Sequence, residues 1–231
     1  MSRREILARL TGLRKRKFDL VHVQTPFVAH YAGAAIAREL KIPLIVSYHT
    51  YFEAYFEKYL PWLPSALLRT FARKYSASQC NAADGIISPS SQMREKLHEY
   101  GVATRIDIIP TGLDLSAHQT GDRNGFRSKF GIEDDETLLL YVGRVAHEKN
   151  IPFLLDMFAR VLKKQPRTKM LIAGEGPALK SLKVHANKSG IGRNTIFAGY
   201  LDRETALLDC YHGADIFVFS SETETQGLVL L

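Results

Sequence analysis

The sequence predicts an α/β protein in two halves, each built on a parallel β-sheet with helices on both faces. Short apolar segments alternate with longer segments in which apolar residues recur every three or four positions, as in amphipathic helices. The short segments are apolar almost throughout, which is typical of parallel strands that are buried on both faces. A polar stretch at 118–125, with two glycines and no periodicity, separates the two series.

In the first half, strands and helices are expected to alternate along the chain. The expected strands are Leu20–Val23, Leu44–Tyr48, Gly85–Ser88 and Ile106–Ile109. The expected helices are Ala29–Leu40, Ser65–Cys80 and Ser91–Tyr100.

The second half repeats this alternation. The expected strands are Thr137–Val142, Lys169–Ala173, Thr195–Ala198 and Asp215–Phe219. The expected helices are Pro152–Lys164, Pro177–Ser189 and Arg203–Tyr211.

Both halves have the strand–helix order of Rossmann-like domains. We expect an N-terminal domain at 1–115, a linker at 116–135 and a C-terminal domain at 136–231. The first half has no opening strand before Arg3, and the second stops inside the apolar run Leu228–Leu231. We therefore expect both domains to be truncated, the first at its opening strand and the second at its C-terminus.

Composition excludes several classes of protein. The net charge is +7, but residues 1–17 hold seven basic side chains and one acidic one, so a net +6 belongs to this segment. With the charge so local and no base-stacking motif, we expect no nucleic-acid partner. No run of about 18 apolar residues predicts a membrane span, and no apolar signal-peptide core follows the basic N-terminus. Cys80 and Cys210 are expected to be reduced, partly buried thiols of a cytosolic protein.

The strand Thr137–Val142 is followed by residues suited to a diphosphate. In open parallel sheets, ligands bind at the carboxyl ends of the strands. Gly143 permits a close approach of the backbone. Arg144 offers a fork of donors, and Lys149 adds a second cation just before a predicted helix. Taken alone, an ordinary surface arginine and lysine explain this pattern as well.

Two later strands end in loops of similar interest. Gly174 and Gly176 form a tight turn, and Pro177 suits the first position of the next helix. Gly227 opens an apolar run whose first amides could bind an anion. Glu224 could accept hydrogen bonds from sugar hydroxyls. The alternatives are an ordinary strand-to-helix loop in the first case and helix capping in the second.

The ordered set of these motifs resembles glycosyltransferase family 4, whose members are retaining enzymes of the GT-B fold. The motifs are Val142-Gly143-Arg144, Glu148-Lys149-Asn150, Ala173-Gly174-Glu175-Gly176-Pro177, Phe197-Ala198-Gly199-Tyr200 and the run from Ser221 to Leu231. The family's signature ends in two glutamates separated by seven residues. Glu224 matches the first, and the second would come directly after Leu231.

The resemblance implies a nucleotide-sugar site. Arg144 and Lys149 would bind the donor diphosphate and stabilise the leaving group. Glu224 would hold hydroxyls of the donor sugar, and the backbone near Tyr200 would meet the nucleobase. The remaining residues implied for this site are Gly143, Gly174, Gly176, Gly227 and Leu228. The family needs no metal, and no Asp-x-Asp motif is present. No cofactor is expected beyond the donor substrate, for which UDP-glucose is the expected form.

The first half matches the acceptor side of the family. His49 follows a predicted strand, and the resemblance implies that it faces the donor sugar and helps to position it. The loop at Pro26–Phe27 is expected to line the same cleft. The segment His49–Leu60 looks like the subset of the family that glucosylates diacylglycerol.

The helix Ser65–Cys80 has the pattern of an interfacial helix. Its apolar stripe consists of Leu67, Leu68, Phe71 and Tyr75. Arg69 and Arg73 are expected on the opposite face, and Trp62 precedes the helix. The basic segment 1–17 could add attraction to anionic lipid. The alternative is that the stripe packs into the core.

Together these observations predict a retaining glycosyltransferase that moves a hexose, expected to be glucose from UDP-glucose, to a lipid acceptor such as diacylglycerol. We expect a cytoplasmic protein that is peripheral on the inner face of the cell membrane. Two alternatives remain open. One is transfer to a soluble or polyprenyl-linked glycan, and the other is an inactive fragment of such an enzyme.

Overall fold

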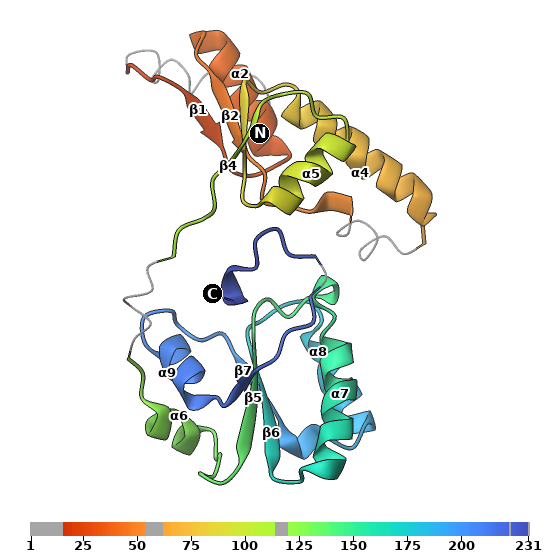
Figure 1. Cartoon of the computed structure of the whole chain (residues 1–231), viewed down its shortest axis with the longest axis vertical. Coiled ribbons are helices and arrows are strands. Elements are labelled where there is room, and N and C mark those ends of the chain that lie inside the picture. The colour runs from red at the N-terminus through yellow and green to blue at the C-terminus, as the bar shows by residue number, and fades with distance from the viewer. Residues whose placement is uncertain (1–15, 54–61, 114–119, 222, 231) are drawn as a thin grey trace. The chain divides into compact units, whose positions relative to one another are not determined.

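A computed structural model describes residues 16–53, 62–113, 120–221 and 223–230 (Figure 1). Most of the basic N-terminal segment and part of the segment His49–Leu60 lie outside these residues. The chain divides into two compact units. Unit 1 comprises Met1–Gly112 and Glu224–Leu228, and unit 2 comprises Leu113–Thr223 and Val229–Leu231.

Unit 1 is built on a parallel sheet of order β1-β2-β3-β4. Its strands are β1 (Val21–Val23), β2 (Leu44–Ser47), β3 (Gly85–Ser88) and β4 (Ile106–Ile108). Its helices are α2 (Val28–Leu40), α4 (Ser65–Cys80) and α5 (Ser91–Glu99). The side chain of Ser90 caps α5 by accepting a hydrogen bond from the amide of Met93 at 3.3 Å. A Cβ at Gly33 would overlap Val23, so this glycine lets α2 lie close against β1.

Unit 2 is built on a parallel sheet of order β7-β6-β5-β8. Its strands are β5 (Thr137–Val142), β6 (Thr168–Ala173), β7 (Thr195–Gly199) and β8 (Ile216–Phe217). Its α-helices are α6 (Arg123–Lys129), α7 (Ile151–Lys164), α8 (Leu179–Lys188) and α9 (Ala206–Gly213). Its short 3₁₀ turns are η2 (His147–Lys149) and η3 (Gly192–Asn194). A further 3₁₀ turn, η4 (Leu228–Leu230), lies at the end of the described chain and begins in the segment assigned to unit 1.

Helices cover both faces of the sheet in unit 2, with α7 and α8 on one face and α6 and α9 on the other (Figure 1). Tyr141 of β5 lies in the same core cluster as Phe158 of α7, whereas its neighbour Leu140 lies in the cluster that contains Phe126 of α6. Successive side chains of a strand point to opposite faces, so both kinds must be apolar. The predicted α/β class with doubly covered parallel sheets is therefore confirmed. Within the described residues, no helix is both long enough and apolar enough to cross a bilayer.

Helix α6 lies inside the segment 116–135 that the sequence predicted to be a linker. Asp122 begins the helix by accepting a hydrogen bond from the amide of Gly125 at 2.8 Å. Phe126, only 4% exposed, packs α6 against α9. At seven residues, the helix is too short to show a clear apolar period. A contact with α9, far along the chain, stabilises it instead.

Two helices of unit 2 begin later than predicted. Helix α8 begins at Leu179 rather than Pro177, because the amide of Ala178 donates to the carbonyl of Val145 at 3.0 Å and the chain turns there. Helix α9 begins at Ala206 rather than Arg203, because the carboxylate of Asp202 holds a turn ahead of it.

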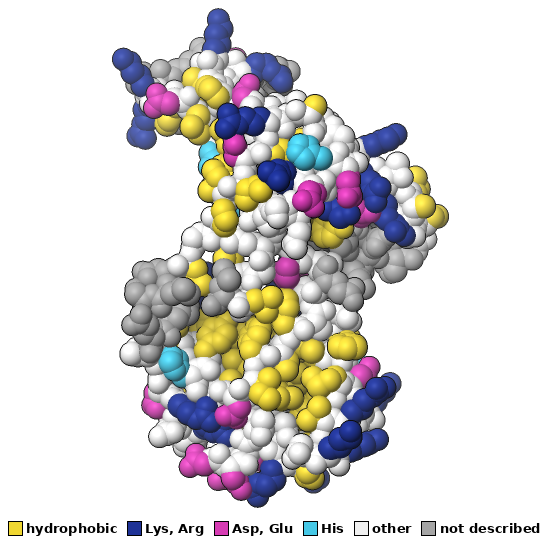
Figure 2. Space-filling view, in the orientation of Figure 1, with side chains coloured by type: hydrophobic (Ala, Val, Ile, Leu, Met, Phe, Trp, Pro, Cys, Tyr) yellow, Lys and Arg dark blue, Asp and Glu magenta, His cyan; other side chains and the backbone are white. Residues whose placement is uncertain are grey.

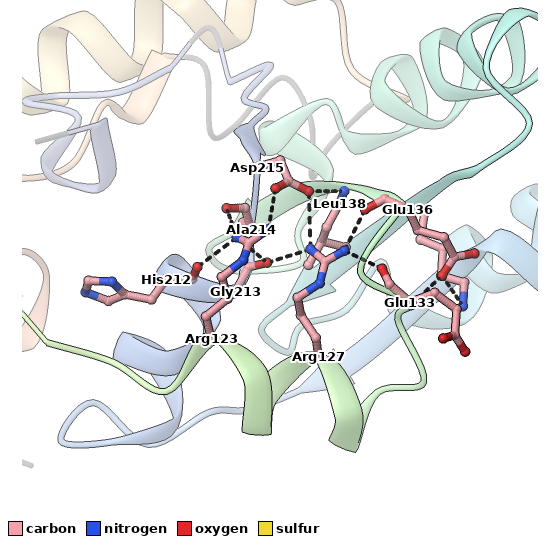
Figure 3. Close-up of polar contacts among 10 residues, drawn as sticks. Arg123, Arg127, Glu133, Glu136, Leu138, His212, Gly213, Ala214 and Asp215 are labelled. Atoms are coloured by element: carbon pink, nitrogen blue, oxygen red, sulfur yellow. Dashed lines mark hydrogen bonds and ion pairs between the residues drawn. The ribbon is translucent and has the colours of Figure 1, made fainter.

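A buried arginine links α6 to the sheet through hydrogen bonds (Figure 3). Arg127 is 2% exposed. Its guanidinium donates to the carbonyl of Gly213 at 3.0 Å and to the carboxylate of Asp215 at 3.2 Å, and also to the carbonyls of Glu133 and Glu136. Asp215 in turn accepts from the amide of Leu138 at the start of β5 at 2.7 Å.

Asp215 is shared by two arginines. The more exposed Arg123 donates to its other carboxylate oxygen at 2.7 Å. Burial tends to raise the pKa of Asp215, but the hydrogen bonds from Leu138, Arg123 and Arg127 lower it overall. The carboxylate therefore stays charged at neutral pH and can serve both arginines.

We predict that Arg127→Met lowers the free energy of unfolding by about 3 kcal/mol, because it leaves a carboxylate and several carbonyls without their buried donor. Arg123→Met should cost less, about 1–2 kcal/mol, because Arg123 is 42% exposed, although it also donates to the carbonyls of His212, Gly213 and Ala214. Urea unfolding of the protein followed by circular dichroism measures both. Equal losses in the two variants would contradict the role of Arg127.

Candidate functional site

The loops that follow β5, β6 and β7 are joined by backbone hydrogen bonds at one edge of the sheet in unit 2. The amide of Val145, after β5, donates to the carbonyl of Glu175, after β6, at 2.9 Å. The amide of Gly174 donates to the carbonyl of Gly199, at the end of β7, at 2.7 Å. The three loops therefore form one backbone surface at the carboxyl ends of the strands.

Two glycines make this close approach possible. Gly174 has φ +134°, and a Cβ at this position would overlap the carbonyl oxygen of Gly143. A Cβ at Gly176 would overlap the carbonyl oxygen of Val145. These are the glycines singled out in the sequence, and they are needed for contact between adjacent loops rather than for a turn alone.

A pocket of about 290 Å³ opens at this edge. Its wall includes four residues predicted for the nucleotide-sugar site, namely Gly143, Arg144, Gly174 and Tyr200. Tyr200 is 69% exposed, so its ring is available at the surface. The lining also includes Glu175 and Arg203, which the sequence analysis did not assign to the site. Arg203 was expected inside a helix, but α9 begins after it, so Arg203 lies in the loop.

Arg144 is oriented by a buried acid. Its side chain is half exposed, and its guanidinium lies 3.8 Å from the carboxylate of Glu148, which is 8% exposed. The spacing of four residues was a signal for this pair, but sequence alone does not show that the acid is buried. A buried carboxylate requires a cationic or hydrogen-bonding partner, so Glu148 restricts where Arg144 can point.

Lys149 lies in the same 3₁₀ turn as Glu148, directly before α7, and is not part of the pocket lining. Its carbonyl accepts a hydrogen bond from the hydroxyl of Ser220 at 2.9 Å, and the hydroxyl of Thr223 donates to the carbonyl of Glu148 at 3.4 Å. The turn is therefore attached to the segment that follows β8. The left-handed conformation of Asn150, with φ +53°, ends the turn and leads into α7.

Three other predicted residues, Glu224, Gly227 and Leu228, belong to a short segment grouped with unit 1. This segment is held there by side chains. The hydroxyl of Ser90 donates to the carbonyl of Thr225 at 2.7 Å, and the Gln226 amide exchanges hydrogen bonds with the backbone of Thr111. Leu228 starts a 3₁₀ turn of three residues instead of the expected helix. None of the three lines the pocket described above.

His49 is exposed at the rim of a second, smaller pocket in unit 1, two residues beyond the end of β2. Of the loop predicted to lie beside it, Pro26 lines the same pocket and Phe27 does not. Burial lowers the pKa of His49, and the nearby ring of His22 lowers it further. His49 is therefore neutral at neutral pH.

Comparisons with known proteins agree with this architecture. A family model described as Glycosyltransferase Family 4 matches residues 3–117, and one described as Glycosyl transferases group 1 matches residues 122–231. The chain is 38% identical to an α-monoglucosyldiacylglycerol synthase of Streptococcus pneumoniae over 94% of its length and 50% of that protein. It is 29% identical to an α-monoglucosyldiacylglycerol synthase of Acholeplasma laidlawii over 94% of its length and 56% of that protein.

Solved structures share the fold at lower identity. The sucrose-phosphate synthase of Thermosynechococcus elongatus superposes with a TM-score of 0.78 at 21% identity, over 97% of this chain and 56% of that one. Anabaena HepE, solved with UDP and glucose, gives a TM-score of 0.78 at 15% identity, over 97% of this chain and 58% of that one.

Two parallel α/β units of this kind define the GT-B fold, as the sequence predicted. The chain belongs to glycosyltransferase family 4. It spans about half the length of the curated relatives it matches.

We predict that Gly174→Ala destabilises unit 2 by 3 kcal/mol or more, as an order-of-magnitude figure, because the added methyl group combines backbone strain with overlap of a carbonyl oxygen. The matched control is Gly190→Ala. Gly190 also has a positive φ, +72°, but nothing lies within 4 Å of its Cβ position. The control should therefore lose only about 1 kcal/mol.

The free energies of unfolding of both variants, measured in urea, separate the cost of backbone strain from the cost of overlap between the added methyl group and the carbonyl oxygen. Losses of the same size would show that the loops after β5 and β6 can move apart freely.

Proposed function

We propose that the protein carrying this chain is a retaining hexosyltransferase that moves glucose from UDP-glucose to the hydroxyl of a lipid such as diacylglycerol. The observation that supports it most directly is the pocket at the carboxyl ends of β5 and β6, where glycine backbone and two arginines line one space. The two α-monoglucosyldiacylglycerol synthases among its relatives support the choice of donor sugar and acceptor.

The chemistry of the pocket suits a nucleoside diphosphate. Backbone at Gly143 and Gly174 has no side chain to keep a ligand away. The guanidinium of Arg144 can form paired hydrogen bonds with phosphate oxygens, and Arg203 supplies a second positive charge. When the bond from the sugar to the diphosphate breaks, negative charge develops on the phosphate oxygen. Cations held in place beforehand stabilise that charge without reorganising.

Lys149 would add a compact charge next to this site, through the turn it shares with Glu148. We propose that the nucleobase of the donor binds near Tyr200, whose ring is exposed beside the pocket. Glu224 and His49 remain proposed contacts of the donor sugar, and the amides of Gly227 and Leu228 remain proposed donors to the diphosphate.

The acceptor proposal is supported by an exposed apolar surface on unit 1. We call this the aromatic surface, and it consists of Phe27, Val28, Tyr31, Trp62, Leu63, Leu67 and Phe71, each at least 38% exposed. Tyr75 of α4 stacks on Phe71 of the same helix at 6.0 Å and on Phe27, the residue before α2, at 5.6 Å, so its ring links the two parts of this surface. Figure 2 shows hydrophobic side chains at the N-terminal end of α4. Exposed patches of this kind are typical of binding surfaces.

The predicted stripe of α4 is divided in the structure. Leu68 is 5% exposed and packs into unit 1, while Leu67 and Phe71 face solvent. Arg73 is not a simple surface cation, because it forms an ion pair with the buried carboxylate of Glu53 at 2.7 Å. Arg69 is exposed, and its guanidinium donates to the hydroxyl of Ser65 at 3.3 Å. The surface half of the stripe therefore suits a lipid surface, and the other half holds the helix in place.

A peripheral position on an anionic membrane follows from this proposal. Apolar side chains would enter the headgroup region, and Arg69 would meet anionic lipid.

We predict that Arg144→Ala and Lys149→Ala each lower kcat/KM for glucose transfer by about 10²–10³-fold, because each removes a cation from the developing phosphate charge. Arg160→Ala is the matched control, since Arg160 is an exposed cation of α7 that does not line the candidate site. Steady-state transfer from UDP-[¹⁴C]glucose to dioleoylglycerol by the full-length protein measures all three. No transfer from any sugar nucleotide by the unaltered protein would overturn the proposed function.

We also predict that the pair Leu67→Ser and Phe71→Ser weakens binding to phosphatidylglycerol vesicles roughly tenfold or more, since burying one such side chain contributes about 1.5–3 kcal/mol. Phe153→Ser is the control, because Phe153 of α7 is 60% exposed and Phe71 58%. Arg69→Ala should weaken binding to anionic vesicles only. Co-sedimentation with anionic and neutral vesicles measures these effects, and unchanged binding in the double variant would favour a soluble acceptor.

A further inference from the structure

The small pocket at the end of β1 and β2 contains a buried histidine that lacks a partner. His30 lies in the first turn of α2 and is 3% exposed. Its Nδ1 atom has no hydrogen-bond partner among the described residues, although it is fully enclosed. Buried polar side-chain atoms in folded proteins are nearly always hydrogen-bonded. A partner that the chain does not supply is therefore expected at this atom.

Three polar residues that line the pocket with His30 have other partners or are weak donors, namely Ser47, Gln79 and Cys80. The hydroxyl of Ser47 is 2.7 Å from the ring of His22. The amide nitrogen of Gln79 donates to the hydroxyl of Tyr75 at 2.8 Å. Burial raises the pKa of the Cys80 thiol to about 12, so the thiol stays protonated and is only a weak donor. None of these three side chains forms a hydrogen bond with Nδ1 of His30.

The size of the pocket limits what can enter. Its free volume is about 20 Å³, and one water-sized group needs roughly 10–15 Å³ on the same measure. A single hydroxyl group fits this space, whereas a sugar ring or an acyl chain does not. The occupant is either a water molecule or one hydroxyl that projects from a larger ligand.

The position of the pocket favours the second of these. It lies at the carboxyl ends of two parallel strands, where ligands of open sheets bind. His49 lines the same pocket and is exposed, so the pocket has an exposed side as well as the buried wall to which His30 belongs. The residue before α2, Phe27, has φ +61° and ψ −123°, an unfavourable backbone conformation for a bulky side chain. Such strain is concentrated at ligand sites, and here it sets the first turn that carries His30.

We propose that this pocket, the His30 pocket, binds one alcohol hydroxyl of a substrate, with Nδ1 of His30 as its hydrogen-bond partner and His49 beside it at the rim. Burial lowers the pKa of the His30 ring. The ring is therefore neutral and can either donate or accept a hydrogen bond at Nδ1, depending on its tautomer. The identity of the alcohol rests on the proposed function. It is a hydroxyl of the acceptor glycerolipid or a hydroxyl of the donor hexose.

The first test compares His30→Leu with His30→Asn in the full-length protein. Leucine removes the polar atom, while the asparagine amide lies near the position of Nδ1. We expect His30→Leu to raise one KM about tenfold, as the loss of one hydrogen bond to a buried hydroxyl does. His30→Asn should stay within about threefold of the unaltered protein. His98→Leu, which changes an exposed histidine of α5 in the same unit, is the control.

The substrate whose KM changes identifies the source of the hydroxyl. An increase for dioleoylglycerol alone assigns it to the acceptor, and an increase for UDP-glucose alone assigns it to the donor. If the folded His30→Leu variant leaves both KM values unchanged, the pocket holds only a structural water and the proposal is wrong.

A second measurement does not depend on catalysis or on folding of the leucine variant. The ¹⁵N chemical shift of His30 Nδ1 is followed by NMR while 1,2-dihexanoylglycerol or UDP-glucose is added. A shift with either ligand supports the pocket, and no shift with both overturns it. A shift without transfer from any sugar nucleotide would reject the proposed function while the hydroxyl site stands.

Discussion

Close backbone contact between the loops of adjacent parallel strands is the constraint on which the site in unit 2 depends. Neighbouring parallel strands end at the same edge of the sheet, so the chains that leave them must share a narrow space. Gly174 meets this constraint by bringing its backbone against the carbonyl of Gly143. On the far side of Arg144, the amide of Val145 donates to the carbonyl of Glu175 and the carbonyl of Val145 accepts from the amide of Ala178, which fixes the loop there. The backbone is therefore fixed on both sides of Arg144, and the ion pair with Glu148 restricts the arginine side chain.

Much of the fold could be predicted because it depends on local patterns. Strands β3 and β5 and helix α4 have the predicted bounds. The two strands are apolar runs between polar residues, and the helix is long enough for its apolar period to be clear. Helix α6 could not be predicted, because its seven residues fold only through a cap and a contact with α9. The burial of Arg127 depends on Asp215, which is 88 residues away. No local pattern reports such a contact.

Part of the candidate site could be predicted, because a close approach of the backbone requires glycine and glycines after a strand can be recognised in the sequence. Gly143, Gly174 and Arg144 follow strands that could be recognised, and the structure brings them together with Tyr200. Arg203 was missed because its place in a loop depends on the turn made by Asp202. His30 was missed for a different reason. A histidine in a helix gives no signal of burial, and the absence of a partner for one ring atom is a property of the packed structure alone.

The two pockets differ in electrostatic character, and this difference suits two tasks within the proposed reaction. A departing diphosphate needs permanent positive charge, which arginine supplies at any physiological pH. An alcohol needs hydrogen-bond partners that leave it uncharged and able to react. In the pocket of unit 1, burial lowers the pKa of both His30 and His49, so both rings are neutral at neutral pH. A neutral pocket does not attract the diphosphate, and so anion binding and hydroxyl recognition would remain in separate units.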